Sequence, residues 1–241
     1  MEIALKVRCG FERIMQRIIR GALVMCGRFI DPDLRGTEAE HSETLVDPFV
    51  DTPVIVPPRA PRRYNVAPTQ EILILAKSPL VALQARWWLV PSWHRGALKD
   101  WKATTFNARI EEAAQKPSFR AVWRHGRCLI PVGGYYEWQS QDGHKVPHAI
   151  LSHSNDPTLW CAGLASRWQD LLTCTMLTRA ANADVSDVHH RMPVILDADE
   201  RAAWLAGSDD FAGFGQGARL RHYPVAPFNS RAEGPALLQP V

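Results

Sequence analysis

The chain has 241 residues, of which 46% are hydrophobic and 22% are charged, values typical of a soluble globular protein. This length favours one large domain or two small ones, and it can bury a core without disulfides or metals. The formal net charge of +3 does not by itself indicate a nucleic-acid partner, because such binders usually carry a clustered basic patch. The apolar runs are too short to span a membrane, so we expect no membrane partner.

The cysteines and tryptophans narrow the class of protein further. No two of the five cysteines form a C-x-x-C pair, so a structural zinc site is not expected. An odd number of cysteines without a secretion signal fits a reducing compartment, here the cytoplasm. Three cysteines in apolar runs are expected to be buried: Cys128, Cys161 and Cys174. Most of the nine tryptophans are expected in an aromatic core, although some could stack on bases.

Residues 1–24 form a basic N-terminal extension that permits two interpretations. The segment lacks a clean hydrophobic stretch and a small-residue cleavage site, so it does not resemble a secretion signal. Ile14, Ile18 and Leu23 lie near one face of a helix, which favours an amphipathic helix. Alternatively, the start codon is misplaced and Met25 is the true initiator. We therefore separate residues 1–24 from residues 25–241, which we expect to form one domain.

The remaining chain predicts many short strands and few helices. The expected strands are residues 26–30, 71–76, 80–88, 128–132, 135–138, 148–152, 159–164, 172–177, 221–225 and 236–239. Asp142-Gly143 predicts a hairpin turn. Helices are expected at residues 106–123, broken at Pro117, at residues 197–205, and near residues 38–45 in an otherwise loop-like region. This pattern favours an α+β fold, with a mainly antiparallel, barrel-like core and flanking helices.

Cys26 is the first residue with chemical interest. An N-terminal cysteine carries an amine and a thiol on adjacent carbons, so it can form a Schiff base with an aldehyde and then close a thiazolidine ring. An abasic site in DNA offers such an aldehyde. If Met25 is the initiator and is removed, the new α-amine has a pKa of about 8 and is partly unprotonated at neutral pH. Taken alone, however, Met25-Cys26-Gly27 is more often an internal, buried cysteine.

Three further segments each carry an alternative interpretation. Asn107 and Arg109 could orient an amine and clamp a phosphate, or they could be a loop cap and a surface charge. Glu137 lies in an aromatic strand, where it either faces solvent or occupies a pocket that suits acid-base chemistry. His189 and His190 could move protons near neutral pH, and they could bind a metal only with a second ligand cluster, which the sequence does not show.

Taken together and in order, the motifs resemble those of the SRAP family (SOS-response-associated peptidase, abasic-site processing proteins). The resemblance runs from Met25 nearly to the end of the chain. The departure inside it is Trp88, where the family usually has glycine. The motifs are MCGRF at 25–29, RYNVAPT at 63–69, RWWLVPSW at 86–93, NAR at 107–109, RCLIPVGGYYEW at 127–138, AN at 181–182 and HHRMPVIL at 189–196.

The resemblance assigns roles to residues at matching positions. It implies that Cys26 is the nucleophile, that Asn107 positions it, and that Glu137 is the acid-base group in imine formation and crosslink reversal. His189 rather than His190 matches the active-site histidine, because the motif reads H-x-R-M-P. The implied DNA contacts are Arg28, Arg109, Arg191, Trp87 and Trp93.

The implied function is covalent capture of abasic sites in single-stranded DNA by Cys26, which shields the damaged sugar. A weak lyase activity and self-cleavage between Met25 and Cys26 are implied as well. We expect a DNA-associated monomer that uses no metal or organic cofactor. Two rivals remain, a noncatalytic single-stranded DNA-binding module and a cysteine peptidase that uses Cys26, His189 and Glu137. The peptidase lacks an evident oxyanion hole in the sequence.

Overall fold

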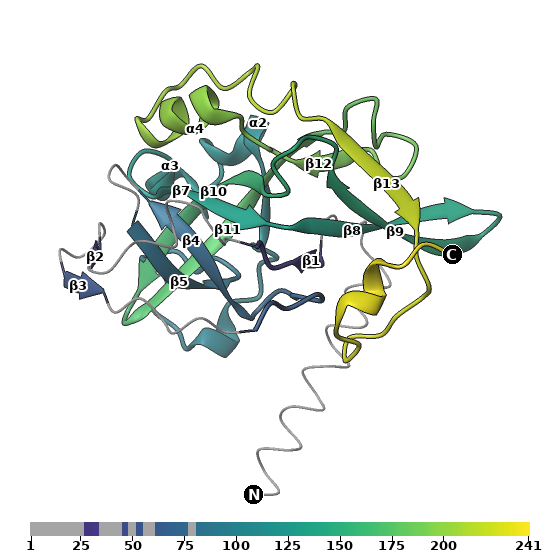
Figure 1. Cartoon of the computed structure of the whole chain (residues 1–241). Helices are drawn as coiled ribbons and strands as arrows, with labels where there is room; N and C mark the ends of the chain where they lie inside the picture. The colour runs from purple at the N-terminus through teal and green to yellow at the C-terminus, as the bar shows by residue number, and fades with distance from the viewer. Residues whose placement is uncertain (1–26, 34–44, 48–51, 55–60, 77–80) are drawn as a thin grey trace, which may run out of the picture.

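A closed barrel of five strands forms the centre of the fold (Figure 1). In the computed structural model, β10 (Leu159–Trp168), β7 (Arg127–Val132), β4 (Glu71–Ala76), β5 (Val81–Trp87) and β11 (Leu171–Ala180) are hydrogen-bonded in this order. The last strand, β11, also pairs with β10, which closes the barrel. Neighbouring strands are antiparallel except for β5 and β11, which are parallel, so the barrel is of mixed type.

The structure describes residues 27–33, 45–47, 52–54, 61–76 and 81–241. Three features expected from the sequence therefore lie outside the described residues: the extension at residues 1–24, the nucleophile Cys26, and all but the last residue of the expected helix near residues 38–45. That last residue, Leu45, begins the short strand β2.

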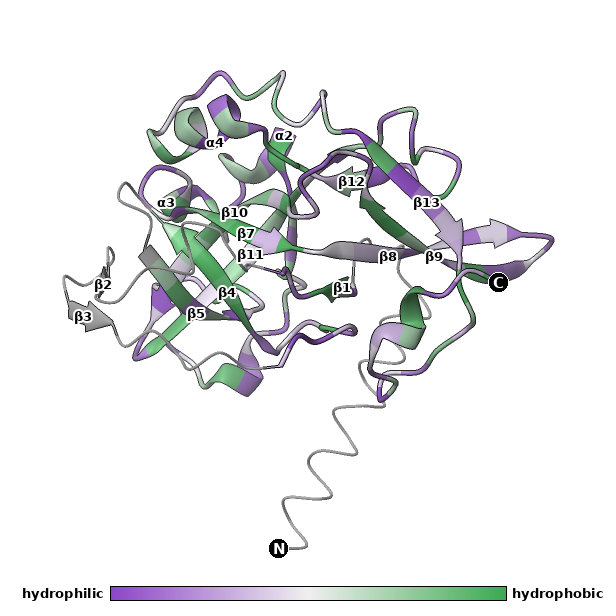
Figure 2. Ribbon diagram, viewed as in Figure 1, coloured by the Kyte–Doolittle hydropathy of each residue, from purple (hydrophilic) through white to green (hydrophobic). Residues whose placement is uncertain are grey.

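The barrel strands are apolar because their side chains are covered on both faces. All six residues of β7 are buried, and nine of the ten residues of β10 are buried, with Arg167 as the exception. Continuous apolar runs of this kind are typical of strands that do not face water on either side. Figure 2 shows the hydrophobic colouring concentrated on the barrel strands and the polar colouring at the tip of the β8–β9 hairpin.

A second, four-stranded sheet extends from the barrel in the order β1 (Phe29–Ile30), β8 (Gly134–Gln141), β9 (His144–Ser152) and β13 (Leu220–Pro224). It is joined directly to the barrel because β8 follows β7. The turn between β8 and β9 has positive φ at Asp142 and Gly143, as the hairpin signal predicts.

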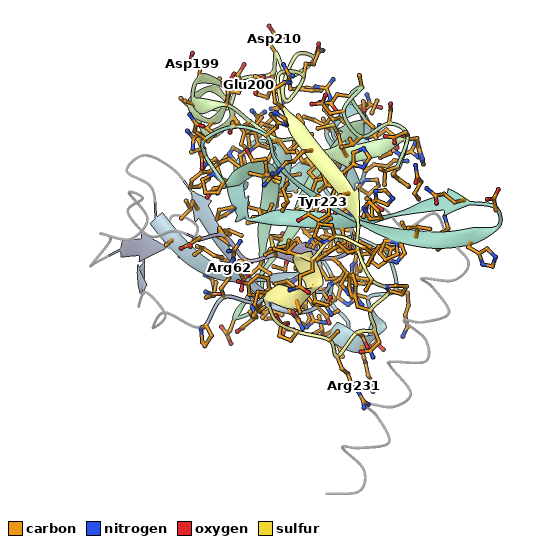
Figure 3. All side chains as sticks on the ribbon, turned by 45° about the vertical axis from the view of Figure 1, so that its right-hand side comes forward. Arg62, Asp199, Glu200, Asp210, Tyr223 and Arg231 are labelled. Carbon is orange, nitrogen blue, oxygen red and sulfur yellow. The ribbon has the colours of Figure 1, made fainter. Side chains whose placement is uncertain are left out.

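The register of this second sheet decides which side chains meet. Phe29 lies opposite Tyr135, and Glu137 lies opposite His148. Tyr223, labelled on β13 in Figure 3, donates its hydroxyl to the Leu238 carbonyl at 2.9 Å, which ties the C-terminal segment to this sheet.

Short elements cover the barrel and complete the fold. Helix α4 begins at a capping box, in which Asp197 accepts from the Glu200 amide and the Glu200 side chain accepts from the Asp197 amide. These elements are β2 (Leu45–Asp47), β3 (Thr52–Val54), the 3-10 helix η2 (Leu98–Asp100), β6 (Asn107–Arg109), α2 (Ile110–Ala113), α3 (Arg120–Trp123), β12 (Arg191–Pro193), α4 (Ala198–Leu205) and the 3-10 helix η3 (Pro235–Leu238).

The predicted α+β fold with a mainly antiparallel, barrel-like core is confirmed, and two element predictions are wrong. Residues 107–109 form strand β6 instead of the start of a helix, because they pair in parallel with β11. Residues 235–238 form a 3-10 helix instead of a strand, with Pro235 in its first turn. The break at Pro117 is confirmed, since α2 ends before it and α3 begins after it.

Arg127 is a buried cation that joins β7 to α4. Its side chain is 4% exposed and lies between the rings of Trp123 and Trp204, at 5.0 and 4.3 Å from their centroids. The guanidinium donates to the carbonyls of Trp123 and Ser208 at 2.9 and 2.5 Å, and it pairs with Asp209 at 3.0 Å. Burial lowers the pKa of this arginine.

Replacing Arg127 with methionine is expected to lower the free energy of unfolding by about 2–4 kcal/mol. Methionine fills the space between the rings but leaves buried carbonyl oxygens without a donor, which costs roughly 1–3 kcal/mol each. Urea unfolding measures the change, and Arg124→Met is the control because Arg124 is exposed. Equal stability of the two variants would contradict an anchoring role.

Candidate active site

Glu137 and His189 meet at the centre of the candidate site. Glu137 lies on β8 and is 3% exposed, so the pocket interpretation of the sequence is correct and the solvent-facing interpretation is wrong. His189 lies in the loop that precedes β12, and its Nδ1 is 3.9 Å from Glu137 Oε1. An ionisable pair removed from water in this way is typical of a site that transfers protons.

The backbone of Arg191 fixes the imidazole of His189. The Nδ1 atom lies 3.2 Å from the Arg191 amide nitrogen and 3.2 Å from the Arg191 carbonyl oxygen. Burial lowers the pKa of His189, although the contact with the Arg191 backbone opposes that shift. The neutral imidazole is therefore favoured at neutral pH, where it can accept a proton. By contrast, His190 is exposed, and its ring lies 4.4 Å from that of His189.

Arg191 is held by a carboxylate that the sequence analysis missed. Its two terminal nitrogens each lie 2.8 Å from an oxygen of Glu111, and one of them also donates to the Thr178 carbonyl at 2.7 Å. Glu111 lies on α2, directly after the strand that carries Asn107 and Arg109. This bidentate pair therefore joins the Asn107 segment to the His189 segment. The spacing of Glu111 four residues after Asn107 was visible in the sequence, but only the fold brings it to Arg191.

The Glu111–Arg191 pair is expected to make stability sensitive to acid. Burial raises the pKa of Glu111, but hydrogen bonds and the charge of Arg191 outweigh this, so its pKa lies below the ordinary value. The pair stabilises the fold above about pH 4.3, the usual pKa of glutamate. This contribution is lost as the pH falls through the lowered pKa of the folded state.

Glu111→Gln should therefore be less stable than the native chain at pH 7 and should lose less stability on acidification. Urea unfolding at pH 7 and pH 3 measures both differences. Glu112→Gln is the matched control, because the ion pairs of Glu112 with Arg109 and Lys116 are exposed. A pH dependence of Glu111→Gln equal to that of the native chain would contradict this role.

The other site residues lie on separate elements. Asn107 is half-buried at the start of β6, opposite Met176 of β11. The side chain of Arg109, in the same strand, is 54% exposed and makes a long ion pair of 3.4 Å with Glu112. Arg28 precedes β1, and burial lowers the pKa of its guanidinium. The structure thus brings Glu137, His189 and Arg191 together, while Arg109 remains open to solvent.

Of the two tryptophans assigned to DNA, only one is accessible. Trp87 is 0% exposed and donates to the Phe106 carbonyl at 2.8 Å, so it belongs to the barrel core and its assignment as a DNA contact is wrong. Trp93 is 48% exposed, and its ring meets that of Trp101 edge-on at 5.6 Å. Trp88, at the unusual position, is half-buried, and its indole donates to the Ala103 carbonyl.

The cysteines and acidic groups of the described chain give no metal centre. Cys128, Cys161 and Cys174 are buried, as predicted, and burial raises the pKa of each thiol. Within the described residues, no group of three or more histidine, cysteine, aspartate or glutamate side chains is placed to hold a metal ion. The helices of the described part are too short or too polar to cross a membrane.

Comparison with solved structures supports the fold. A protein from Bacteroides thetaiotaomicron superimposes with a TM-score of 0.62 at 26% identity, covering 74% of this chain and 85% of that chain. A protein from Bordetella bronchiseptica reaches a TM-score of 0.64 at 24% identity, covering 84% of this chain and all of the other, and this likeness concerns the fold alone.

Sequence comparison gives the family. Abasic site processing protein YoqW of Bacillus subtilis is 33% identical over 189 residues, which cover 75% of this chain and 80% of YoqW. Abasic site processing protein YedK of Escherichia coli is 27% identical over 234 residues, which cover 90% of this chain and 100% of YedK. Residues 25–227 match the family model described as SOS response associated peptidase (SRAP). The chain therefore belongs to the SRAP family.

Proposed function

We propose that this protein processes abasic sites in single-stranded DNA by forming a covalent bond through Cys26. The observation that carries the proposal is the buried pair formed by Glu137 and His189. The match to the family model begins at Met25, directly before Cys26. Relatives that match most of the chain are named abasic site processing proteins. The active form in this proposal begins at Cys26, whether translation starts at Met25 or residues 1–25 are removed.

The register of β1 and β8 supports a role for Cys26 beside Glu137. Phe29 lies opposite Tyr135, and the Tyr136 amide donates to the Arg28 carbonyl at 3.0 Å. Continuing this register brings Gly27 level with Glu137. Because Gly27 is bonded to Cys26 in the chain, this register supports the proposal that Glu137 acts on Cys26.

The proposed reaction needs two proton transfers that this pair can supply. The α-amine of Cys26 adds to the sugar aldehyde, and Glu137 protonates the departing hydroxyl, so that water leaves and an imine forms. The thiolate then attacks the imine carbon, and the nitrogen takes up a proton as the thiazolidine closes. The balance is one aldehyde and one aminothiol giving one thiazolidine and one water. His189, neutral at neutral pH, is the proposed base for the later proton transfers, including release or strand cleavage.

The proposed DNA contacts combine a cation and a stacking surface. Arg109 is open to solvent and can bind a phosphate. The exposed ring of Trp93 can stack on a base, which is typical of single-stranded DNA binding. The Arg28 carbonyl accepts from the amide of Tyr136, the residue before Glu137, and the Arg191 backbone contacts His189. Arg191 would have to leave Glu111 before it could bind a phosphate with both terminal nitrogens.

A denaturing gel tests the proposal against its rivals. The chain beginning at Met25 is incubated with single-stranded DNA that carries one abasic site, and with the same strand carrying an intact base. The proposal predicts an adduct with the abasic strand alone that survives denaturation without a reducing agent. A noncatalytic binding module or a cysteine peptidase would give no such adduct, and that result would overturn the proposal.

Affinity for single-stranded DNA is expected to fall as salt rises. Each phosphate contact releases bound counterions, with a slope of about −0.7 in log affinity against log salt per contact. Arg109→Ala should lower the affinity, and it should reduce the magnitude of the slope by the amount expected for about one phosphate contact. Arg124→Ala is the control, because Arg124 is also an exposed arginine. Fluorescence anisotropy at several salt concentrations measures the slope, and an affinity independent of salt would contradict a phosphate-binding surface.

A further inference from the structure

Two histidines and an aspartate form a line of contacts behind Glu137. His148 lies on β9 directly opposite Glu137, and its Nδ1 is 3.1 Å from Nδ1 of His222 on β13. The other ring nitrogen of His222, Nε2, is 3.4 Å from Oδ1 of Asp187. Asp187 precedes His189 by two residues, so one loop carries both ends of the arrangement. Strands β8, β9 and β13 lie side by side in Figure 1.

We propose that His148, His222 and Asp187 form a proton relay between Glu137 and solvent. The inference rests on the proposed function, in which Glu137 gives up and regains a proton. It adds residues that act through Glu137 and do not touch the DNA.

The exposure of the four side chains changes in the order that a relay requires. Glu137 and His148 are 3% and 5% exposed, whereas the His222 side chain is 22% exposed and that of Asp187 is 58% exposed. A buried acid exchanges protons with water only through other groups or through opening of the fold. The contacts from His148 through His222 to Asp187 provide such a route to the surface, and it begins opposite Glu137 in the register.

The two imidazoles share a hydrogen bond that requires one proton between them. An Nδ1-to-Nδ1 distance of 3.1 Å is a hydrogen bond only if one ring donates and the other accepts. The remaining nitrogen of His148, Nε2, is buried and has no hydrogen-bond partner among the described residues. Cross-strand partners have Cβ atoms about 4.5–5.5 Å apart. This nitrogen is therefore available to Glu137, directly or through one water molecule.

The surroundings of His148 favour its neutral form at rest. Burial and the neighbouring His222 lower the pKa of His148, and Asp187 partly opposes this shift. The groups that bear on the line are Glu137 on β8, His222 on β13, and Asp187 and His189 in the loop before β12. Lys145, at the start of β9, and Arg191 add positive charge near His189 and thereby lower the pKa of that histidine.

In the proposed relay, three protons each move by one step, and all three move toward Glu137. A proton from solvent, guided by Asp187, binds Nε2 of His222, and the Nδ1 proton of His222 passes to Nδ1 of His148. The Nε2 proton of His148 passes to the Glu137 carboxylate, so both rings end neutral in the opposite tautomer. When Glu137 later returns its proton, the reverse passage restores the starting tautomers.

The first test compares rates of crosslink formation and release between pH 5.5 and 9. His148→Gln should slow both rates by about 10–100-fold, less than the ~10²–10⁴-fold that a directly acting group contributes. His222→Gln and Asp187→Asn should slow them by smaller factors and shift the pH profile. Added imidazole should restore much of the rate in His148→Gln and His222→Gln. Asp142→Asn, at the exposed tip of the same hairpin, is the control for loss of one carboxylate.

The second test is independent of DNA chemistry. Nitrogen NMR of the histidine rings of the native chain should show His148 and His222 as opposite tautomers that titrate together, and Asp187→Asn should lower the pKa of His148. If the native chain forms no adduct, the proposed function fails while the ring measurement still decides whether the two histidines share a proton. If the native chain forms the adduct but His148→Gln, His222→Gln and Asp187→Asn keep its rates and pH profile, the relay alone is overturned. Independent titration of the two rings would also overturn it.

Discussion

Replacing Cys26 with alanine is expected to abolish the adduct that survives denaturation, reducing it below detection on the gel. Alanine retains the α-amine, so an imine with the sugar aldehyde can still form, but no thiol is present to close the ring. The imine hydrolyses on denaturation. Borohydride, which reduces an imine to a stable amine, should therefore reveal a band with Cys26→Ala that is absent without the reductant.

Cys26→Ser is the matched variant, because it differs from the native chain by one atom and keeps a nucleophile at the same position. The hydroxyl of serine is far less nucleophilic than a thiolate, so we expect the same dependence on borohydride. The initiator Met25 must be removed in each variant so that residue 26 becomes the N-terminus, and mass spectrometry of the purified chains verifies this. A stable adduct of Cys26→Ala without borohydride would overturn the thiazolidine mechanism.

The strands could be predicted from the sequence because the pattern that forms them is local. Apolar runs bounded by turns gave β4, β7, β10 and β11, and Asp142-Gly143 gave the β8–β9 hairpin. Closure of the barrel was harder to predict from the sequence, because it depends on two pairings between strands. Strand β11 pairs with β10 on one side and in parallel with β5 on the other. Residues 107–109 form a strand only because of a pairing about 70 positions away in the chain, which a local helical pattern does not contain.

The sequence predicted the types of residue in the site, but it did not predict the contacts between them. The resemblance selected Glu137 and His189, and the structure brings them together. It could not supply Glu111, because that residue matters through an ion pair with Arg191 across 80 positions of the chain. Trp87 was misassigned for the related reason that a motif tryptophan has the same appearance in sequence whether it stacks on a ligand or fills the core. Its exposed fraction of zero decides for the core.

The conversion of Glu137 to glutamine is expected to slow crosslink formation by about 10²–10⁴-fold, the usual contribution of a positioned acid or base. Glutamine keeps the size and the hydrogen-bonding oxygen of the buried side chain but carries no exchangeable acidic proton. Release of a formed crosslink should slow by a similar factor, because the same proton moves in reverse. Rates are measured on abasic single-stranded DNA, with release followed in the presence of a competing abasic strand.

Three further variants are measured in the same assay as comparisons for Glu137→Gln. Glu112→Gln, on the partly exposed surface of α2, should match the native rates and thereby excludes an effect of net charge. His189→Ala should mainly slow release or strand cleavage, since the neutral imidazole is the proposed base of the later steps, and His190→Ala should change little because His190 is exposed. A crippled His190→Ala beside an active His189→Ala would reverse the assignment within the pair. If Glu137→Gln kept both native rates, the acid-base role would belong to another group, and the buried contact between Glu137 and His189 would have a structural purpose instead.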